Sequence, residues 1–233
     1  MVSAIVVAAG KGVRMGNTIS KQYLRLGERP ILGHTLMTID ACQLVDKIYL
    51  VVPAGDFDFC RQNIIAPLKL SKEIKLVPGG AARQDSVYNG LLKIEEKAGI
   101  VVIHDGVRPF VLPEQLAMCI NGAKESGACI LGIPAVDTLK KVNEAGFIKA
   151  TIGREGVWHA QTPQAFKFDL IIKAHKKARQ AGYVASDDAL LVERLGEKIT
   201  MLAGSIYNIK ITTKEDLLLA QAIIDTGQIL LPS

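Results

Sequence analysis

The chain has 233 residues and a formal net charge of +5 at neutral pH, with 49% hydrophobic and 22% charged residues. These values are ordinary for a globular protein and predict one domain, 1–233, of α/β class. No apolar run approaches the roughly 18 residues of a membrane span, and no secretion signal is recognisable, so we expect a soluble, cytoplasmic protein. Basic residues are scattered and aromatic residues make up only 5%, which argues against nucleic acid as a partner and favours a small anionic substrate.

A glycine-rich, basic loop after an apolar run is the first feature along the chain. The run Ala4–Ala9 predicts a central parallel strand that is buried on both faces. Gly10 and Gly12 then allow backbone N–H groups to approach anionic oxygens closely, and Arg14 and Lys21 add full positive charges. This combination predicts a site for the phosphates of a nucleotide.

Two common glycine motifs do not fit this loop. Gly10 and Gly16 are six residues apart, and Lys-Ser/Thr does not follow them as a Walker A motif requires. The third glycine and the acidic residue of the dinucleotide fingerprint are also missing. Two cations instead favour nucleotidyl transfer, because negative charge develops at the attacked α-phosphorus and on the departing pyrophosphate. The structural alternative is an ordinary strand-to-helix turn with solvated basic residues.

Apolar runs alternate with helical patterns along the rest of the chain. Strands are predicted at 47–52, 73–77, 100–104, 128–133 and 198–202, and helices at 83–98, 167–181, 187–195 and 214–224. This order predicts a Rossmann-like domain with a mostly parallel sheet and helices on both faces. Ligands of such sheets bind at the carboxyl ends of strands, so we expect the loop after Ala9, segment 79–83 and segment 104–106 to converge.

Residues 137–159 break this alternation and predict an inserted β-hairpin arm. Two short extended runs, 138–142 and 147–152, flank the turn-forming sequence 143–146. An isolated hairpin is only marginally stable, so we expect the arm to pack against a second subunit and form a homodimer. A hairpin folded onto its own domain is the alternative.

Several single residues carry local predictions. Asp105 is placed to meet Mg²⁺ or a substrate hydroxyl, or else to cap the next turn. We expect Ser186 to cap helix 187–195, segment 162–164 to form a turn, and His175 to lie at the surface. The four cysteines and four histidines lack the spacing of a disulfide framework or a metal site, so we expect reduced thiols and assign no protein ligand to a metal.

Eight segments, in order along the chain, resemble those of one enzyme family. They are 8–16, 21–23, 79–86, 104–109, 137–140, 158–164, 186–189 and 208–212. Together they make the chain similar to the 2-C-methyl-D-erythritol 4-phosphate cytidylyltransferases. The resemblance implies a homodimeric enzyme of the non-mevalonate isoprenoid pathway, which uses CTP, methylerythritol phosphate and Mg²⁺ and releases pyrophosphate.

The resemblance also implies roles for individual residues. Arg14 and Lys21 would stabilise the α-phosphate during transfer, while Arg154 and Lys210 would hold the methylerythritol phosphate for in-line attack. The nucleotide site would be lined by Ala8, Ala9, Gly10, Gly80, Ser86 and Gly106, and the sugar phosphate would contact Asp105, Thr138, Thr162 and Ser186. In the family the arm crosses to the partner, which implies that Thr138 and Arg154 complete the other subunit's site.

Three other functions compete with this interpretation. The ribitol-5-phosphate cytidylyltransferases share the Arg-Met-Gly, Arg-Pro-Phe and Gln-Thr-Pro-Gln segments, but their loop usually begins Ala-Gly-Gly. Here Ala8-Ala9-Gly10, Arg154 and Trp158-His159 favour methylerythritol phosphate. A non-catalytic nucleotide-binding regulatory module is disfavoured because both Arg14 and Lys21 are retained. A nicotinamide-dependent oxidoreductase is the third alternative and would require dinucleotide binding.

Overall fold

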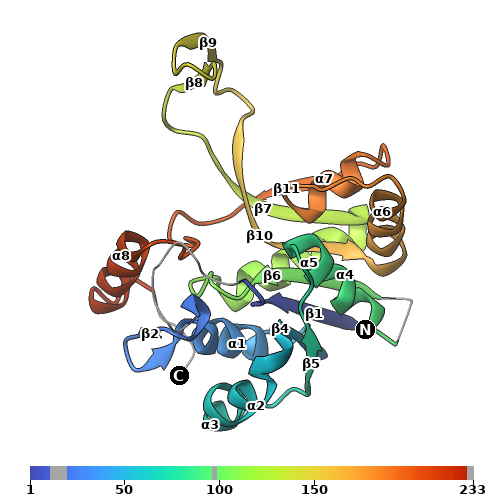
Figure 1. Ribbon diagram of the computed structural model, residues 1–233, viewed down its shortest axis with the longest axis vertical. Coiled ribbons are helices and arrows are strands. Elements are labelled where there is room, and N and C mark those ends of the chain that lie inside the picture. Colours follow the sequence, from blue (N-terminus) through green and yellow to red (C-terminus); the bar gives the residue numbers. More distant parts are fainter. Residues whose placement is uncertain (11–19, 96–98, 230–233) are drawn as a thin grey trace.

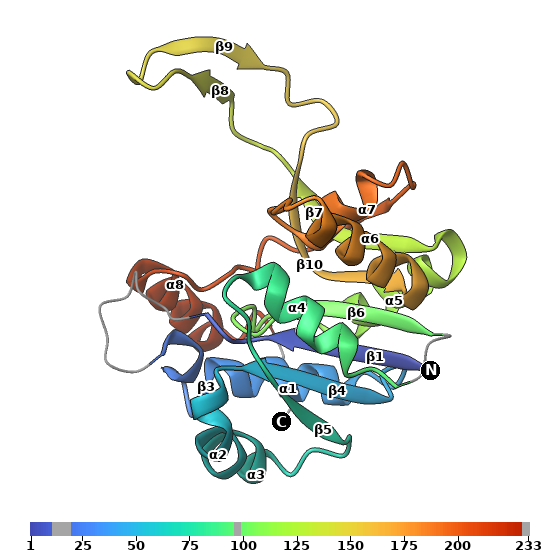
Figure 2. The ribbon, with the colours of Figure 1, turned by 45° about the vertical axis from the view of Figure 1, so that its right-hand side comes forward.

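The chain folds around a seven-stranded sheet with helices on both faces (Figure 1). The computed structural model describes residues 1–10, 20–95 and 99–229. A thin arm stands clear of both helical layers, as Figure 2 shows from a second direction. No helix in the described ranges is long and apolar enough to cross a membrane. The seven-stranded sheet with helices on both faces confirms the predicted α/β class.

The sheet is parallel except for one strand. In spatial order its strands are β11 (Thr200–Ala203), β7 (Ala128–Pro134), β10 (Trp158–Lys167), β6 (Ile100–Asp105), β1 (Val2–Val7), β4 (Lys47–Val52) and β5 (Ile74–Pro78). Strand β10 runs antiparallel to both of its neighbours, while the other pairs are parallel. Every strand predicted from an apolar run is present, with ends shifted by at most two residues.

Strand β10 was not predicted, and the expected turn at 162–164 is wrong. These residues lie inside β10, where the pairing with β7 changes register between Ala160 and Gln164. The Thr162–Pro163 peptide bond at this irregularity is cis. Proline is tolerated at such interruptions because it has no N–H to donate to the ladder. Turn-forming chemistry therefore marks a bulge within a strand here.

The helices alternate with the strands. The longer ones are α1 (Ile31–Ala41), α4 (Arg83–Leu92), α5 (Pro113–Ser126), α6 (Phe168–Gln180), α7 (Asp188–Glu193) and α8 (Lys214–Asp225). Shorter pieces are the 3-10 helices Lys21–Tyr23 and Ala54–Asp56, single turns α2 (Phe57–Phe59) and α3 (Ala66–Leu68) around the π-helix Cys60–Ile65, and the small ladder of β2 (Arg25–Leu26) with β3 (Arg29–Pro30). Helix α4 ends before the predicted residue 98, which lies outside the described residues.

Two apolar cores cover the two faces of the sheet. Because successive strand residues point to opposite faces, Ala4 and Val6 pack with α1 and α5, while Ile5 packs with α4, α6 and α7. All three side chains are buried. Burial of an aliphatic side chain of this size stabilises the fold by about 1.5–3 kcal/mol. The prediction of a central strand buried on both faces is confirmed.

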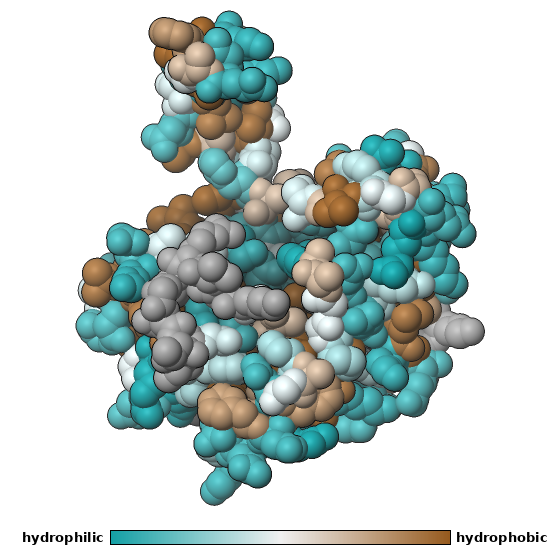
Figure 3. Space-filling model, in the orientation of Figure 1, coloured by the Kyte–Doolittle hydropathy of each residue, from teal (hydrophilic) through white to brown (hydrophobic). Residues whose placement is uncertain are grey.

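The predicted hairpin is present, and it extends away from its own domain (Figure 1). Its paired strands lie within 139–152, and residues 158–159 of the predicted arm belong to β10. Strands β8 (Leu139–Val142) and β9 (Ile148–Ile152) pair antiparallel around a turn in which Asn143 Oδ1 accepts a hydrogen bond from the Phe147 N–H. Nearly every residue of both strands is exposed. Figure 3 shows apolar side chains on this arm.

Candidate active site

A cavity of about 630 Å³ opens at the carboxyl ends of β1 and β6, beside the first turn of α4. The three segments that were predicted to converge all contribute to it. Its lining includes Ala8, Ala9, Gly10, Lys21, Gly80, Arg83, Ser86, Asp105 and Lys210. Gly106, also predicted to line the nucleotide site, is not part of this lining, and its N–H donates to the Val7 carbonyl at 2.9 Å. The convergence predicted from strand ends is therefore present in the structure.

The glycines at 79 and 80 allow two loops to pass unusually close together. A Cβ at Gly79 would lie 2.2 Å from the Ala9 Cβ, and one at Gly80 would lie 2.3 Å from the Asp85 Cβ. The Gly80 N–H donates to Ser86 Oγ at 3.0 Å, which ties this loop to α4. The amino end of α4 thereby faces the cavity, where its dipole favours anionic groups.

Asp105 forms the charged centre of the site. Its buried Oδ1 lies 2.9 Å from Arg83 Nε, and its Oδ2 lies 2.8 Å from Lys210 Nζ and 3.8 Å from Arg108 Nε. Burial by itself would raise the pKa of Asp105, but the Arg83 and Lys210 charges outweigh it and hold that pKa well below its usual range. The carboxylate is therefore ionised and engaged with cations.

A smaller cavity of about 140 Å³ adjoins the first one. Arg83, Asp105 and Lys210 line both cavities, and Thr162 and Ser186 line the smaller one. The structure thus brings Asp105, Thr162 and Ser186 together, as the resemblance implied for residues near a sugar phosphate. Two adjoining spaces that share a wall of charged groups suit a reaction between two anionic substrates.

Thr138 and Arg154 do not line either cavity in the described part of the chain. Both lie on the exposed arm, and Arg154 Nη1 donates to the Val136 carbonyl at 2.7 Å. Arg14 falls outside the described residues. Of the four predicted catalytic cations, the structure therefore places two, Lys21 and Lys210, in the lining of the same cavity.

A buried histidine supports the wall between the two cavities. Thr162 Oγ1 accepts from the Asp105 N–H at 3.1 Å and lies 3.0 Å from His104 Nδ1. The other ring nitrogen of His104 lies 3.0 Å from the Arg108 carbonyl and must be the protonated one, because a carbonyl only accepts. Burial lowers the pKa of His104 to about 4, so the ring is neutral at neutral pH.

Lys21 belongs to a short helix that is anchored from its other end. The Tyr23 hydroxyl donates to Asp56 at 2.8 Å and lies 3.2 Å from Cys60 Sγ. The Tyr23 ring also packs against Phe59. These contacts fix the turn that carries Lys21 into the cavity lining.

Two local predictions near the site are wrong. His175 is fully buried rather than at the surface, because it points from α6 to Asp188 and its Nε2 lies 3.0 Å from Oδ1 of that residue. The cap of α7 is Asp187, whose Oδ1 accepts from the Leu190 N–H at 3.0 Å, and not Ser186. Ser186 instead faces the smaller cavity.

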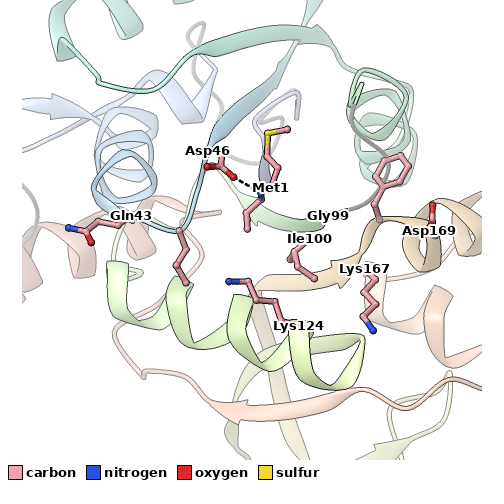
Figure 4. Close-up of a pocket in the computed structure, with 11 residues that line it drawn as sticks. Met1, Gln43, Asp46, Gly99, Ile100, Lys124, Lys167 and Asp169 are labelled. Atoms are coloured by element: carbon pink, nitrogen blue, oxygen red, sulfur yellow. Dashed lines mark hydrogen bonds between the residues drawn. The ribbon is translucent and has the colours of Figure 1, made fainter.

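A separate cavity of about 660 Å³ lies near the amino ends of β1 and β6. Figure 4 shows Met1, Asp46, Lys124 and Lys167 around it. None of the predicted site residues lines it. Substrates of open α/β sheets bind at the carboxyl ends of the strands, so the chemistry belongs to the opposite edge.

Comparison with known proteins decides the family. A model of the 2-C-methyl-D-erythritol 4-phosphate cytidylyltransferases matches residues 2–226. The chain belongs to this family. It is 50% identical over 223 residues to the cytidylyltransferase of Syntrophus aciditrophicus (strain SB), covering 96% of this chain and 95% of that protein. It is 46% identical over 227 residues to that of Pelotomaculum thermopropionicum, covering 97% and 95%.

Solved structures of this cytidylyltransferase family have the same fold. The 4-diphosphocytidyl-2C-methyl-D-erythritol synthase of Anaerococcus prevotii superposes with a TM-score of 0.85 at 33% identity, over 96% of each chain. The cytidylyltransferase of Francisella tularensis superposes with a TM-score of 0.80 at 31% identity, over 95% of this chain and 98% of that one. The predicted family, fold and enzyme class are thus confirmed.

Sequence reasoning gave no role to Arg83, which lines both cavities, or to Asp188, which binds it. Arg83 and Asp188 are paired at 2.7 Å between Nη1 and Oδ2, although 105 residues separate them. Segments 79–83 and 186–189 were both singled out by their motifs. Nothing in either motif indicated that the two would meet.

Proposed function

We propose that the 630 Å³ cavity holds CTP and that the adjoining 140 Å³ cavity holds 2-C-methyl-D-erythritol 4-phosphate. The cytidylyl group would pass from the first substrate to the second. The observation that carries this proposal is the wall that the two cavities share, formed by Arg83, Asp105 and Lys210. Two substrates on either side of this wall would place a phosphate oxygen beside the α-phosphorus of CTP. Such positioning can supply a large part of the rate enhancement.

The chemistry is a direct displacement. A phosphate oxygen of methylerythritol phosphate forms a bond to the α-phosphorus, the bond from that phosphorus to the β-phosphate oxygen breaks, and pyrophosphate leaves with the bonding electrons. Lys21 at the nucleotide cavity and Lys210 at the shared wall are placed to neutralise charge on the phosphates. The amino end of α4 adds its dipole. Arg14 is proposed as a further cation on the basis of the family pattern.

The proposal extends to a homodimer in which each arm serves the partner's site. Phe147 is 72% exposed and Ile148 is 64% exposed, so the arm presents apolar surface that a second copy would cover. Thr138 and Arg154 are carried on the same arm, away from the cavities of their own chain. A partner arm reaching the smaller cavity would supply both residues.

The residues that the structure describes around the site do not by themselves form a magnesium site. The described residues contain no group of three His, Cys, Asp or Glu side chains that could hold a metal ion. Asp105 is already engaged by cations. We therefore propose that Mg²⁺ takes its ligands mainly from the triphosphate and from water. A cytoplasmic location is part of the same proposal, and the four buried free cysteines fit a reducing compartment.

The deciding experiment measures pyrophosphate release from CTP and Mg²⁺ with methylerythritol 4-phosphate, and in parallel with ribitol 5-phosphate. We expect turnover with methylerythritol phosphate and a cytidine diphosphate product of matching mass. Preference for ribitol phosphate would contradict the proposed acceptor. If neither acceptor gave pyrophosphate release, a non-catalytic nucleotide-binding module would be favoured.

A further inference from the structure

A line of charged and polar groups runs from the buried His175 of α6 to the partly exposed Lys210 at the shared wall of the two cavities. His175 Nε2 lies 3.0 Å from Asp188 Oδ1, and Asp188 Oδ2 accepts from Arg83 Nη1 at 2.7 Å. Arg83 Nε then donates to Asp105 Oδ1 at 2.9 Å, and Asp105 Oδ2 lies 2.8 Å from Lys210 Nζ. Each of the four carboxylate oxygens therefore has a donor.

His175 is an unexpected residue at its position. It lies on the buried face of α6 with Ile171 and Ala178, where an apolar side chain would avoid the cost of burying a polar ring. Its Nδ1 has no hydrogen-bond partner in the described structure. The Nε2 must carry the proton, because the Asp188 carboxylate beside Arg83 is an acceptor. The ring also stacks against Tyr88 of α4, with 6.1 Å between ring centroids, but its one hydrogen bond in the described structure is to Asp188 Oδ1.

With His175 on Oδ1 of Asp188, Arg83 binds that carboxylate through Oδ2. A guanidinium can bind both oxygens of one carboxylate through two parallel hydrogen bonds. Here Arg83 instead divides its donors between two carboxylates, which leaves Asp105 Oδ2 to Lys210. If Asp188 no longer held Nη1, Arg83 could turn and take both oxygens of Asp105. Lys210 would then lose its anchor.

We propose that His175 and Asp188 are positioning residues that act through Arg83 and Asp105 to fix the Lys210 ammonium at the wall between the two substrates. The inference rests on the proposed function for its effect on catalysis. The positions of Arg83 and Lys210 can also be tested without turnover. Lys210 lines both cavities, but the family resemblance implies that it holds methylerythritol phosphate, so loss of its anchor should weaken use of that substrate more than use of CTP.

The kinetic test compares His175→Leu, which removes the donor, with His175→Gln, whose amide N–H can reach the position of Nε2. Ile171→Ala is the control, because it disturbs the packing of the same helix face without touching the line of charges. For His175→Leu we expect kcat/KM for methylerythritol phosphate to fall between about 10-fold and about 100-fold per folded enzyme. We expect the KM for CTP to stay within about two-fold, and the Gln variant to recover most of the loss.

Equal kinetics for His175→Leu and Ile171→Ala, or a Gln variant no better than the Leu variant, would overturn the proposal. Should His175→Leu fail to fold, Asp188→Asn takes its place, since the amide keeps the side-chain shape. For Asp188→Asn we also expect kcat/KM for methylerythritol phosphate to fall while the KM for CTP stays nearly unchanged. An equal loss of kcat/KM for both substrates in that variant would count against positioning.

A measurement that needs no turnover separates this inference from the proposed function. The Nε–H signal of Arg83 in ¹⁵N-labelled protein, assigned with Arg83→Lys, reports the contact with Asp105. We expect this signal to shift or broaden in His175→Leu and to stay in place in Ile171→Ala. An unchanged signal in His175→Leu would overturn the positioning role. A wild-type protein that releases no pyrophosphate would instead contradict the proposed function alone.

Discussion

Lys210 Nζ lies 2.8 Å from Asp105 Oδ2, with the lysine side chain 38% exposed and the aspartate side chain 7% exposed. The ammonium is thus held from inside the protein while part of its surface faces the cavities. Asp105 accordingly orients a cation in this structure. This arrangement shows how a carboxylate can lie in the site proposed for two highly anionic substrates.

Asp105→Asn should destabilise the protein. The change leaves Arg108 and Lys210 without their anion and Arg83 with Asp188 alone, and removing one partner of a buried pair typically costs about 3–5 kcal/mol. Urea denaturation of both proteins gives the free energy of unfolding. Asp58→Asn is the control, since Asp58 is 86% exposed and its pair with Arg61 should contribute less than about 1 kcal/mol. Equal effects of the two changes would contradict this prediction.

Lys21→Ala should abolish most turnover while the fold stays intact. Loss of one preorganised charge contact to the reacting phosphate lowers kcat by about 10²–10³-fold. Kinetics at saturating CTP, together with thermal unfolding, check both parts. Lys124→Ala is the matched control, because Lys124 lines the cavity at the opposite edge of the sheet. An active, normally folded Lys21→Ala protein would remove this lysine from the mechanism.

Ile148→Asp should weaken the proposed dimer. A charge at the first residue of the exposed β9 strand would be costly to bury against a second copy. Sedimentation velocity at assay concentrations should show a monomer for this variant and a dimer for the wild type. Val184→Asp serves as the control, because Val184 is also exposed but lies on the globular body. A wild-type protein that sediments as a monomer would contradict the proposed assembly.

Mixed dimers should show whether Arg154 acts across the interface. Lys21→Ala and Arg154→Ala proteins are each expected to be nearly inactive alone. After mixing and subunit exchange, one site in each mixed dimer would contain both native cations, so roughly a quarter of wild-type activity should return. If Arg154 served its own chain, the mixture would stay inactive.

His104 should make stability fall in mild acid. Burial lowers its pKa to about 4, whereas the unfolded chain binds the proton near pH 6.5, so the unfolded state gains the proton first as pH falls. Stability from this residue is complete above about pH 6.5 and is lost as pH falls toward about 4. Between about pH 7 and about pH 4.5 the wild type should lose about 2 kcal/mol more than His104→Gln in urea denaturation. If the stability of the wild type and of His104→Gln changed in parallel with pH, the prediction would be contradicted.

Local patterns were sufficient to predict most elements of the fold. Each apolar run that was interpreted as a strand is one. For the central strands β1, β4, β6 and β7 the reason is that a strand buried on both faces must be continuously apolar. The hairpin followed from two extended runs around a turn containing Gly146, whose φ is +83°. The location of the site followed from the rule that ligands gather at the carboxyl ends of parallel strands.

The sequence by itself determined the α/β class, the arm and the segments that meet at the site, because these depend on short-range hydrophobic patterns and backbone preferences. Only the tertiary structure decided that residues 162–164 lie inside β10 and that His175 is buried. It also decided the link from Asp188 through Arg83 to Asp105. These contacts join residues far apart in the chain, and their energy comes from charges brought together in a low-dielectric interior, which no local pattern records.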